Sequence, residues 1–166
     1  MIIRGRVHLF GDDIDTDRII PGPYLRTTDP YELASYCMYG IDREFPKRVK
    51  EGDIIVAGEN FGCGSSREQA PLSIKYCGIK AVVAESFARI FYRNAINIGL
   101  IPVVCRGIKR FVKDGDMLEI DLERRVIKVG GRELPCEVPE GIAWEILKAG
   151  GLVKYAKLRR GDLDGR

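Results

Sequence analysis

Short apolar runs alternate with helical segments through the middle of the chain. Residues 54–57, 81–84 and 101–105 have the length and composition of buried strands. Residues 66–77 and 87–98 separate these runs, and each is followed by a glycine, as expected at the end of a helix. This alternation predicts βαβ units and therefore a parallel sheet with right-handed crossovers.

The segment before this region is less regular. Residues 2–10 predict a strand, and the prolines within residues 19–23 predict a stiff, extended connection. The sequence Thr28-Asp29-Pro30 is typical of a helix start, so we expect a helix over residues 31–38.

After Cys105 the pattern changes to short apolar runs between polar turns, which predicts antiparallel strands. The expected elements are strands at 117–121, 126–129 and 134–138, helices at 141–149 and 152–160, and a loose tail at 161–166. Residues 1–166 are therefore interpreted as one α/β domain with a mixed, largely parallel sheet flanked by helices.

Composition and charge exclude several function classes. Of the 166 residues, 45% are hydrophobic and 31% are charged, which is a globular composition. The 27 basic and 24 acidic side chains give a net charge of +3, and this near balance does not favour a nucleic-acid or membrane-surface partner. We see neither an apolar run long enough to span a membrane nor a secretory signal, so the expected location is the cytoplasm.

Cysteine usage indicates reduced thiols rather than disulfides or a metal site. The count is odd, and no two cysteines form a Cys-x-x-Cys pair. The five are Cys37, Cys63, Cys77, Cys105 and Cys136. Because His8 is the only histidine, the chain is expected to hold neither zinc nor an iron–sulfur cluster by itself.

The glycine-rich segment at residues 62–68 carries the strongest chemical signal. It lies where a buried strand is followed by a helix, a position at which α/β folds bind ligands and anions. The dinucleotide motif would need glycine in place of Arg67, and the phosphate-binding loop would need a lysine after Gly64. An ordinary capping box, Ser65 with Glu68, remains open. Arg67 favours an anion site, because the helix dipole disfavours a cation in the first turn.

Other candidate residues are weaker. The acidic segment 12–17 does not fit a calcium loop, because Arg18 and Tyr24 stand where glycine and glutamate are required. Asx turns are the alternative for this segment. Cys63 lies where a helix end lowers a thiol pKa, but no histidine base is near it in the sequence. We expect Arg89 and Arg93, four residues apart on one helix, to serve in structural pairing or partner contact rather than in catalysis.

Three segments taken together resemble a known family. Residues 11–20, 58–68 and 86–94, in this order and spacing, resemble the small subunit of 3-isopropylmalate dehydratase. This family includes archaeal homoaconitase small subunits, and it is the detached swivelling domain of the aconitase superfamily. The resemblance implies a β/β/α swivelling fold and a large subunit that carries a 4Fe–4S cluster. It also implies a hydro-lyase that moves a hydroxyl between adjacent carbons through a cis-alkene, as in leucine biosynthesis.

The resemblance assigns roles to individual residues. Ser65 corresponds to the base that removes the carbon-bound proton, while Ser66 and Arg67 correspond to residues that bind substrate oxygens. The segment Asp15-Thr16-Asp17 is expected to line and support the site, together with Gly62 and Gly64.

The resemblance also places the loop that contains Arg26 and Thr27 against the variable arm of the substrate. An arginine beside an isopropyl group would be desolvated without a partner, whereas a carboxylate would form a charge-assisted fork with it. The family as a whole favours the isomerisation of 2-isopropylmalate and 3-isopropylmalate, and a homoaconitase small subunit is the alternative. From Arg26 we expect either dual activity, on isopropylmalate and a homocitrate-type tricarboxylate, or a preference for the tricarboxylate. The non-enzymatic alternative is a stand-alone module that binds an anion or RNA.

Overall fold

Seven strands form one mixed sheet in a computed structural model that describes residues 1–163. The order across the sheet is β4-β3-β2-β1-β5-β6-β7. The strands are β1 (Ile2–Leu9), β2 (Ile54–Ala57), β3 (Ala81–Ala84), β4 (Ile101–Val104), β5 (Met117–Asp121), β6 (Val126–Val129) and β7 (Arg132–Pro135). The sheet is mixed, as predicted, but it is not largely parallel, because three of its six strand pairings are parallel and three are antiparallel.

Strands β1 to β4 form the parallel half. Helix α4 (Gln69–Tyr76) connects β2 to β3, and α5 (Arg89–Ile98) connects β3 to β4, which confirms the predicted βαβ units. Both helices begin two or three residues later than the sequence suggested. Gly99 ends α5 in the left-handed conformation, with φ of 87°, as its position predicts.

The antiparallel half begins on the other edge of β1. Strand β5 pairs with β1, β6 with β5, and β7 with β6. The two outer edges then meet, because Val104 and Glu137 exchange backbone hydrogen bonds of 3.0 and 2.8 Å. The sheet therefore curls and closes at this point.

Two apolar clusters lie on the two faces of the sheet. Alternate residues of a strand enter different clusters. Ile54 and Val56 share a cluster with residues of β5, β6 and helix α6 (Ile142–Ala149), while Ile55 and Ala57 share one with residues of α4 and helix α2 (Pro30–Ala34). This division explains why β2, β3 and β4 are apolar throughout, since both of their faces are covered.

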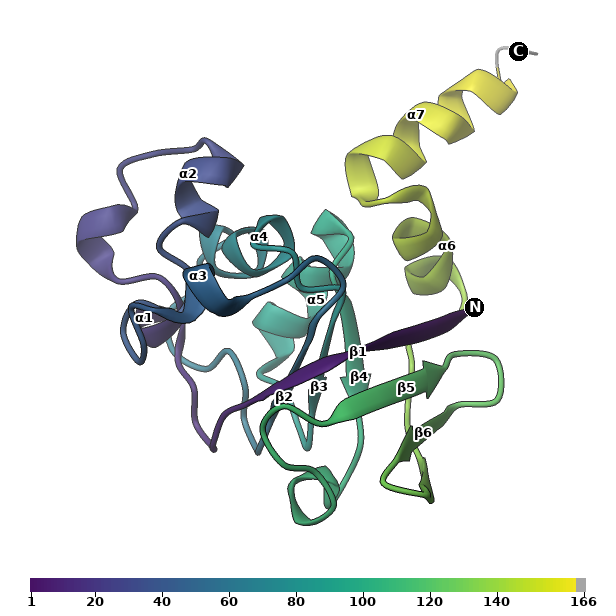
Figure 1. Cartoon of the computed structure of the whole chain (residues 1–166). Coiled ribbons are helices and arrows are strands. Elements are labelled where there is room, and N and C mark those ends of the chain that lie inside the picture. The colour runs from purple at the N-terminus through teal and green to yellow at the C-terminus, as the bar shows by residue number, and fades with distance from the viewer. Residues whose placement is uncertain (164–166) are drawn as a thin grey trace.

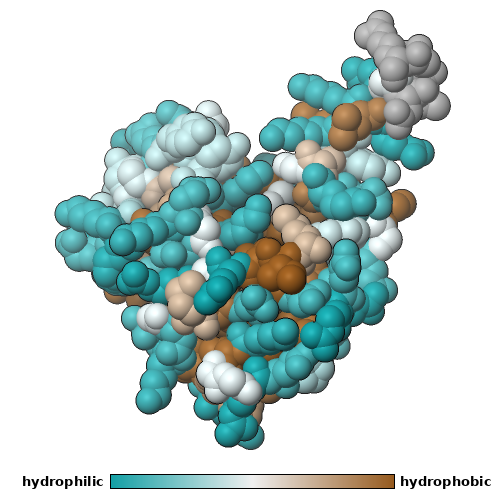
Figure 2. Space-filling view, turned by 45° about the vertical axis from the view of Figure 1, so that its right-hand side comes forward, coloured by the Kyte–Doolittle hydropathy of each residue, from teal (hydrophilic) through white to brown (hydrophobic). Residues whose placement is uncertain are grey.

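Helix α6 (Ile142–Ala149) packs against the core through Ile146 and Leu147, and α7 (Leu152–Leu163) projects from the body of the molecule (Figure 1). The surface is largely hydrophilic, interrupted by small apolar patches (Figure 2). Val153 and Leu158 of α7 are among the exposed apolar side chains. None of the helices described in residues 1–163 is long and apolar enough to span a membrane.

Several local expectations are corrected. Strand β7 begins two residues and ends three residues earlier than predicted. Helix α7 continues to Leu163, into the segment expected to be a loose tail, and residues 164–166 lie outside the described chain. The helix expected at 31–38 is present as α2 (Pro30–Ala34), which is shorter than predicted. Four short elements appear where no helix was predicted: α1 (Thr16–Ile19), η1 (Gly22–Tyr24), α3 (Phe45–Arg48) and η2 (Ile108–Arg110).

Candidate functional site

The loops that follow β1, β2 and β3 lie side by side at the carboxyl ends of the strands. Backbone hydrogen bonds extend the parallel pairing beyond the sheet. The Gly62 N–H donates to the Ile14 carbonyl at 2.7 Å, and the Thr16 N–H donates to the Cys63 carbonyl at 2.9 Å. On the other side, the Ala88 N–H donates to the Phe61 carbonyl at 2.9 Å. The three loops therefore form one rigid platform.

Glycine at position 62 is required by the packing of this platform. Its φ is +82°, and a Cβ at this position would overlap the Phe91 ring of α5. Any side chain here would meet both backbone strain and a steric clash.

The acidic segment after β1 supports the platform rather than binding calcium. The Asp12 carboxylate accepts a hydrogen bond from the Glu59 N–H at 2.8 Å and pairs with Lys109 at 2.9 Å. These two contacts lower the pKa of Asp12 below its usual value. Asp15 caps α1 by accepting from the Arg18 N–H at 2.8 Å, a local turn of the kind that the alternative interpretation predicted.

Arg67 is held in place by α1. Its guanidinium forms an ion pair of 2.7 Å with Asp17 and also donates to the Ile20 carbonyl at 3.3 Å. The Thr16 hydroxyl donates to the Ser65 carbonyl at 2.9 Å, which joins α1 to the serine segment. The Arg67 side chain is 24% exposed, so part of the cation remains accessible.

A cavity of about 210 Å³ opens between this segment and the start of α5. Its lining residues are Thr16, Gly62, Gly64, Ser65, Ser66, Arg67, Ala88, Arg89, Ile90, Phe91 and Asn94. Six of the ten site residues predicted from the sequence thus meet at one cavity. Asp15 and Asp17 support this group from α1, as described above.

The capping-box interpretation of Ser65 is wrong. Helix α4 begins at Gln69, its N-cap is Glu68, and no side chain caps it. Within the described chain, the Ser65 hydroxyl forms no hydrogen bond, and the backbone N–H groups of residues 64–68 donate to no acceptor. These groups remain available to an anionic ligand.

Sequence reasoning missed Arg89 and Asn94 as cavity residues. We expected Arg89 to have a structural or partner-binding role, yet it lines the cavity, whereas Arg93 does not. The available signal was topological: α5 follows the strand next to β2, so its first turn lies at the same edge of the sheet as Ser65.

Arg26 and Thr27 do not line this cavity. Arg26 is exposed in the loop between η1 and α2, and Thr27 accepts a hydrogen bond from the Asp29 N–H at 3.0 Å. Their expected contact with substrate therefore stays a prediction.

Comparison with known proteins gives this geometry a family. The model of the aconitase C-terminal domain matches residues 10–107, more than half of the chain and all three loops of the platform. The chain belongs to this family. It is 67% identical over 162 residues to the methanogen homoaconitase small subunit of Methanocaldococcus jannaschii, covering 96% of this chain and 94% of the relative.

Further relatives and a solved structure place the chain among the small subunits of this family. It is 55% identical over 158 residues to 3-isopropylmalate dehydratase small subunit 1 of Methanopyrus kandleri, covering 94% of this chain and 93% of the relative. A crystal structure of 3-isopropylmalate dehydratase from Methanocaldococcus jannaschii superimposes with a TM-score of 0.96 at 65% identity and covers 99% of both chains. The predicted aconitase-type fold is thereby confirmed.

Two further kinds of chemistry were considered in the sequence, a nucleophilic thiol at Cys63 and the binding of a metal cluster. Burial and the carboxylates of Asp15 and Asp13 raise the pKa of the Cys63 thiol. The expectation that a helix end lowers this pKa is therefore wrong. No group of three or more metal-ligating side chains gathers within the described residues.

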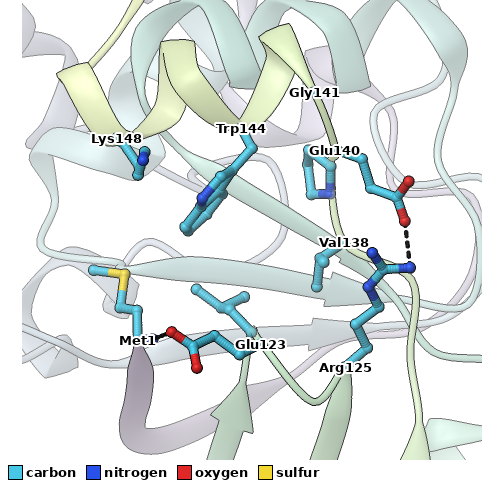
Figure 3. Close-up of a pocket in the computed structure, with 10 residues that line it drawn as sticks. Met1, Glu123, Arg125, Val138, Glu140, Gly141, Trp144 and Lys148 are labelled. Atoms are coloured by element: carbon cyan, nitrogen blue, oxygen red, sulfur yellow. Dashed lines mark ion pairs between the residues drawn. The ribbon is translucent and has the colours of Figure 1, made fainter.

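A second, larger cavity lies at the opposite end of β1 (Figure 3). It measures about 520 Å³ and includes Trp144 of α6 and Met1 in its lining. The Arg125 and Glu140 side chains at its rim form an ion pair.

Proposed function

We propose that this small subunit supplies the proton-abstracting and carboxylate-binding half of a hydro-lyase active site. The supporting observation is that an uncommitted serine hydroxyl, Ser65, shares one cavity with the partly accessible guanidinium of Arg67. The family membership shown above supports the same reaction class.

The residues of the cavity suit the chemistry. A serine hydroxyl is a poor base, so the alkoxide must be stabilised by nearby positive charge and N–H donors. The Arg67 guanidinium supplies the positive charge, and the backbone N–H groups of the cavity residues 64–67 supply the donors. Ser65 then takes the proton from the carbon next to a substrate carboxylate, while Arg67 and Ser66 hold that carboxylate. The electron pair of the broken C–H bond forms the alkene as the adjacent hydroxyl leaves.

The other half of the site belongs, in this proposal, to a large subunit. The relatives are named small subunits, which implies a partner chain. We propose that the partner carries a 4Fe–4S cluster, which acts as the Lewis acid for the hydroxyl group. The complex is expected in the cytoplasm, and the five free cysteines support that location.

We propose a homocitrate-type tricarboxylate as the preferred substrate. Arg26 supports this choice, because a guanidinium on the loop expected to face the variable arm suits a carboxylate rather than an isopropyl group. The 67% identity to a homoaconitase small subunit also favours it. Isopropylmalate is the second candidate, supported by the 55% identity to a dehydratase small subunit.

Reconstitution with the large subunit tests both parts of the proposal. kcat/KM is measured on isopropylmalate and on the homologous tricarboxylate, for the wild type and Arg26→Val. The variant should lose roughly 30-fold or more on the tricarboxylate, the low end of the cost of truncating a buried charge pair. Turnover of isopropylmalate should be retained or improved.

A matched control is Arg4→Val, which removes an exposed arginine from β1. An unchanged substrate ratio in Arg26→Val would show that Arg26 does not face the variable arm. Absence of turnover on both substrates by the wild-type complex would instead contradict the hydro-lyase assignment and favour the stand-alone binding module.

A further inference from the structure

Two arginines from separate elements line the cavity beside Ser65. Arg67 belongs to the loop after β2, and Arg89 is the first residue of α5. They are the only charged residues in the lining, which contains no carboxylate. Asp17 neutralises part of the charge of Arg67, whereas Arg89 has neither an ion pair nor a side-chain hydrogen bond within residues 1–163. The cavity therefore carries an excess of positive charge.

The backbone that carries Arg89 is fixed to the loop that carries Ser65. The Ala88 N–H donates to the Phe61 carbonyl of that loop at 2.9 Å. Phe91, which is 2% exposed, packs its ring edge-on against the Phe61 ring, with 5.2 Å between the centroids. The start of α5 is thus held in position before any ligand binds, which lowers the cost of binding.

The position of Arg89 opposes the local preference of its helix. The amino end of a helix carries partial positive charge, which disfavours a cation in the first turn. No acidic residue stands in the first turn of α5 to offset this cost. Arg93, four residues later, is also exposed but does not line the cavity. A residue that costs its helix stability and lines a cavity points to a role in binding.

The proposed reaction supplies an anion for each arginine. Isopropylmalate and the homologous tricarboxylate both carry carboxylates on two adjacent carbons, and the mechanism above assigns Arg67 and Ser66 to only one of them. A guanidinium holds a carboxylate through two parallel N–H donors. A second carboxylate that leaves water needs a comparable partner. Arg89 is the other cation of the lining.

We propose that Arg89 binds the second of these two carboxylates, across the cavity from the one held by Arg67 and Ser66. The identity of the substrate rests here on the proposed function. Two cations make the cavity selective for substrates with two carboxylates, because a monocarboxylate leaves one guanidinium without an anion. Both candidate substrates share these carboxylates, so Arg89 binds the common part of the molecule, whereas Arg26 is expected to face the variable arm.

Binding of isopropylsuccinate to the reconstituted complex tests the proposal. This probe carries both carboxylates, has no hydroxyl to lose and offers no third carboxylate to Arg26. Calorimetry at saturating large subunit measures its Kd for the wild type, Arg89→Gln, Arg89→Lys and the matched control Arg93→Gln. Arg89→Gln should raise the Kd about 10-fold or more, the usual contribution of a charge-assisted hydrogen bond. Arg89→Lys keeps the charge but loses the fork, so its Kd should lie between, and Arg93→Gln should match the wild type.

A separate titration of the small subunit against the large subunit distinguishes substrate binding from partner contact. The proposal is overturned if the wild-type complex does not bind the probe, if Arg89→Gln leaves the Kd unchanged, or if Arg93→Gln raises the Kd equally. It is also overturned if Arg89→Gln weakens only the association of the two subunits.

Turnover by the wild-type complex is measured in parallel, because it tests the proposed function separately. Turnover together with an unchanged Kd in Arg89→Gln would overturn the role of Arg89 alone. Binding that depends on Arg89, without turnover of isopropylmalate or the tricarboxylate, would contradict the hydro-lyase assignment and leave the dicarboxylate site in place.

Discussion

The two ends of β1 differ in how far their charges are neutralised. At its amino end, the charged groups around the larger cavity have partners: the Met1 amino group lies 3.6 Å from Glu123, and Arg125 pairs with Glu140 (Figure 3). At its carboxyl end, Arg67 has one ion-pair partner, and Arg89 has none within the described chain.

The proposed function places the chemistry at the smaller of the two cavities. The cavity at the amino end is more than twice as large, at about 520 Å³ against about 210 Å³. The smaller one combines uncommitted N–H groups, a free hydroxyl and available positive charge, which are the features that an anionic substrate requires. Variants at both ends of β1 test this distinction.

Ser65→Ala should give the largest effect. Turnover of the reconstituted complex should fall by about 10²–10⁴-fold, the usual contribution of a general base. Stability should not change, because Ser65 does not cap α4. The control is Ser35→Ala, an exposed serine whose hydroxyl donates only to the Glu32 carbonyl. Near-normal turnover of Ser65→Ala, measured under the same conditions, would remove Ser65 from the mechanism.

Gly62→Ala should destabilise the chain by about 2–4 kcal/mol, because overpacking against Phe91 adds to the strain of a left-handed backbone. Gly131→Ala, in the turn between β6 and β7, should cost only about 1–2 kcal/mol. It has a similar φ of +76°, but nothing lies near its missing Cβ. Chemical denaturation of both variants measures the difference. Equal losses would show that packing does not constrain the platform.

Asp12→Asn should change how stability depends on pH. The pKa of Asp12 is lowered in the folded chain, first by the Glu59 N–H and then by Lys109. Its carboxylate therefore stabilises the fold above the unfolded pKa, near 3.8, and this contribution is lost as pH falls through the folded pKa. Thermal melts from pH 6 downwards should show the variant and the wild type converging in acid. A constant gap in Tm would contradict this role.

Arg125→Gln should give the smallest effect. The ion pair with Glu140 is more than half exposed on both sides, so its loss should cost less than about 1 kcal/mol. Turnover of the reconstituted complex should remain unchanged. A clear fall in kcat/KM would mean that the amino end of β1 takes part in function after all.

The sequence predicted the bounds of an element correctly where the hydrophobic pattern was clear. Strands β5 and β6 were predicted with their observed bounds, because alternating apolar residues between polar turns leave only one register. Helix α1 was missed because four residues are too few for a hydrophobic period. It forms because Asp15 caps it and because its neighbours hold it.

In the candidate site, too, local signals were read correctly and positions that depend on the tertiary fold were not. Ser65, Ser66 and Arg67 were found from local sequence, since glycines and an arginine at a strand-to-helix junction are a local signal. The start of α4 was misplaced because Ser65 and Glu68 have the spacing of a cap, whereas Gly64, with φ of +95°, prolongs the loop. Arg89 could not be found in this way, because its position depends on which strands are neighbours.

The stretch at residues 25–28 differs from the rest of the site region in its freedom to vary. Its backbone bonds only locally, with the Leu25 N–H donating to the Gly22 carbonyl, and it shares no backbone hydrogen bond with the three loops of the platform. Substitutions at residues 26–28 should therefore leave the framework around Ser65 in place. Evolution can therefore alter this stretch in a duplicated gene without rebuilding the fold, so lineages can diverge at residue 26 while they keep Ser65 and Arg67 unchanged.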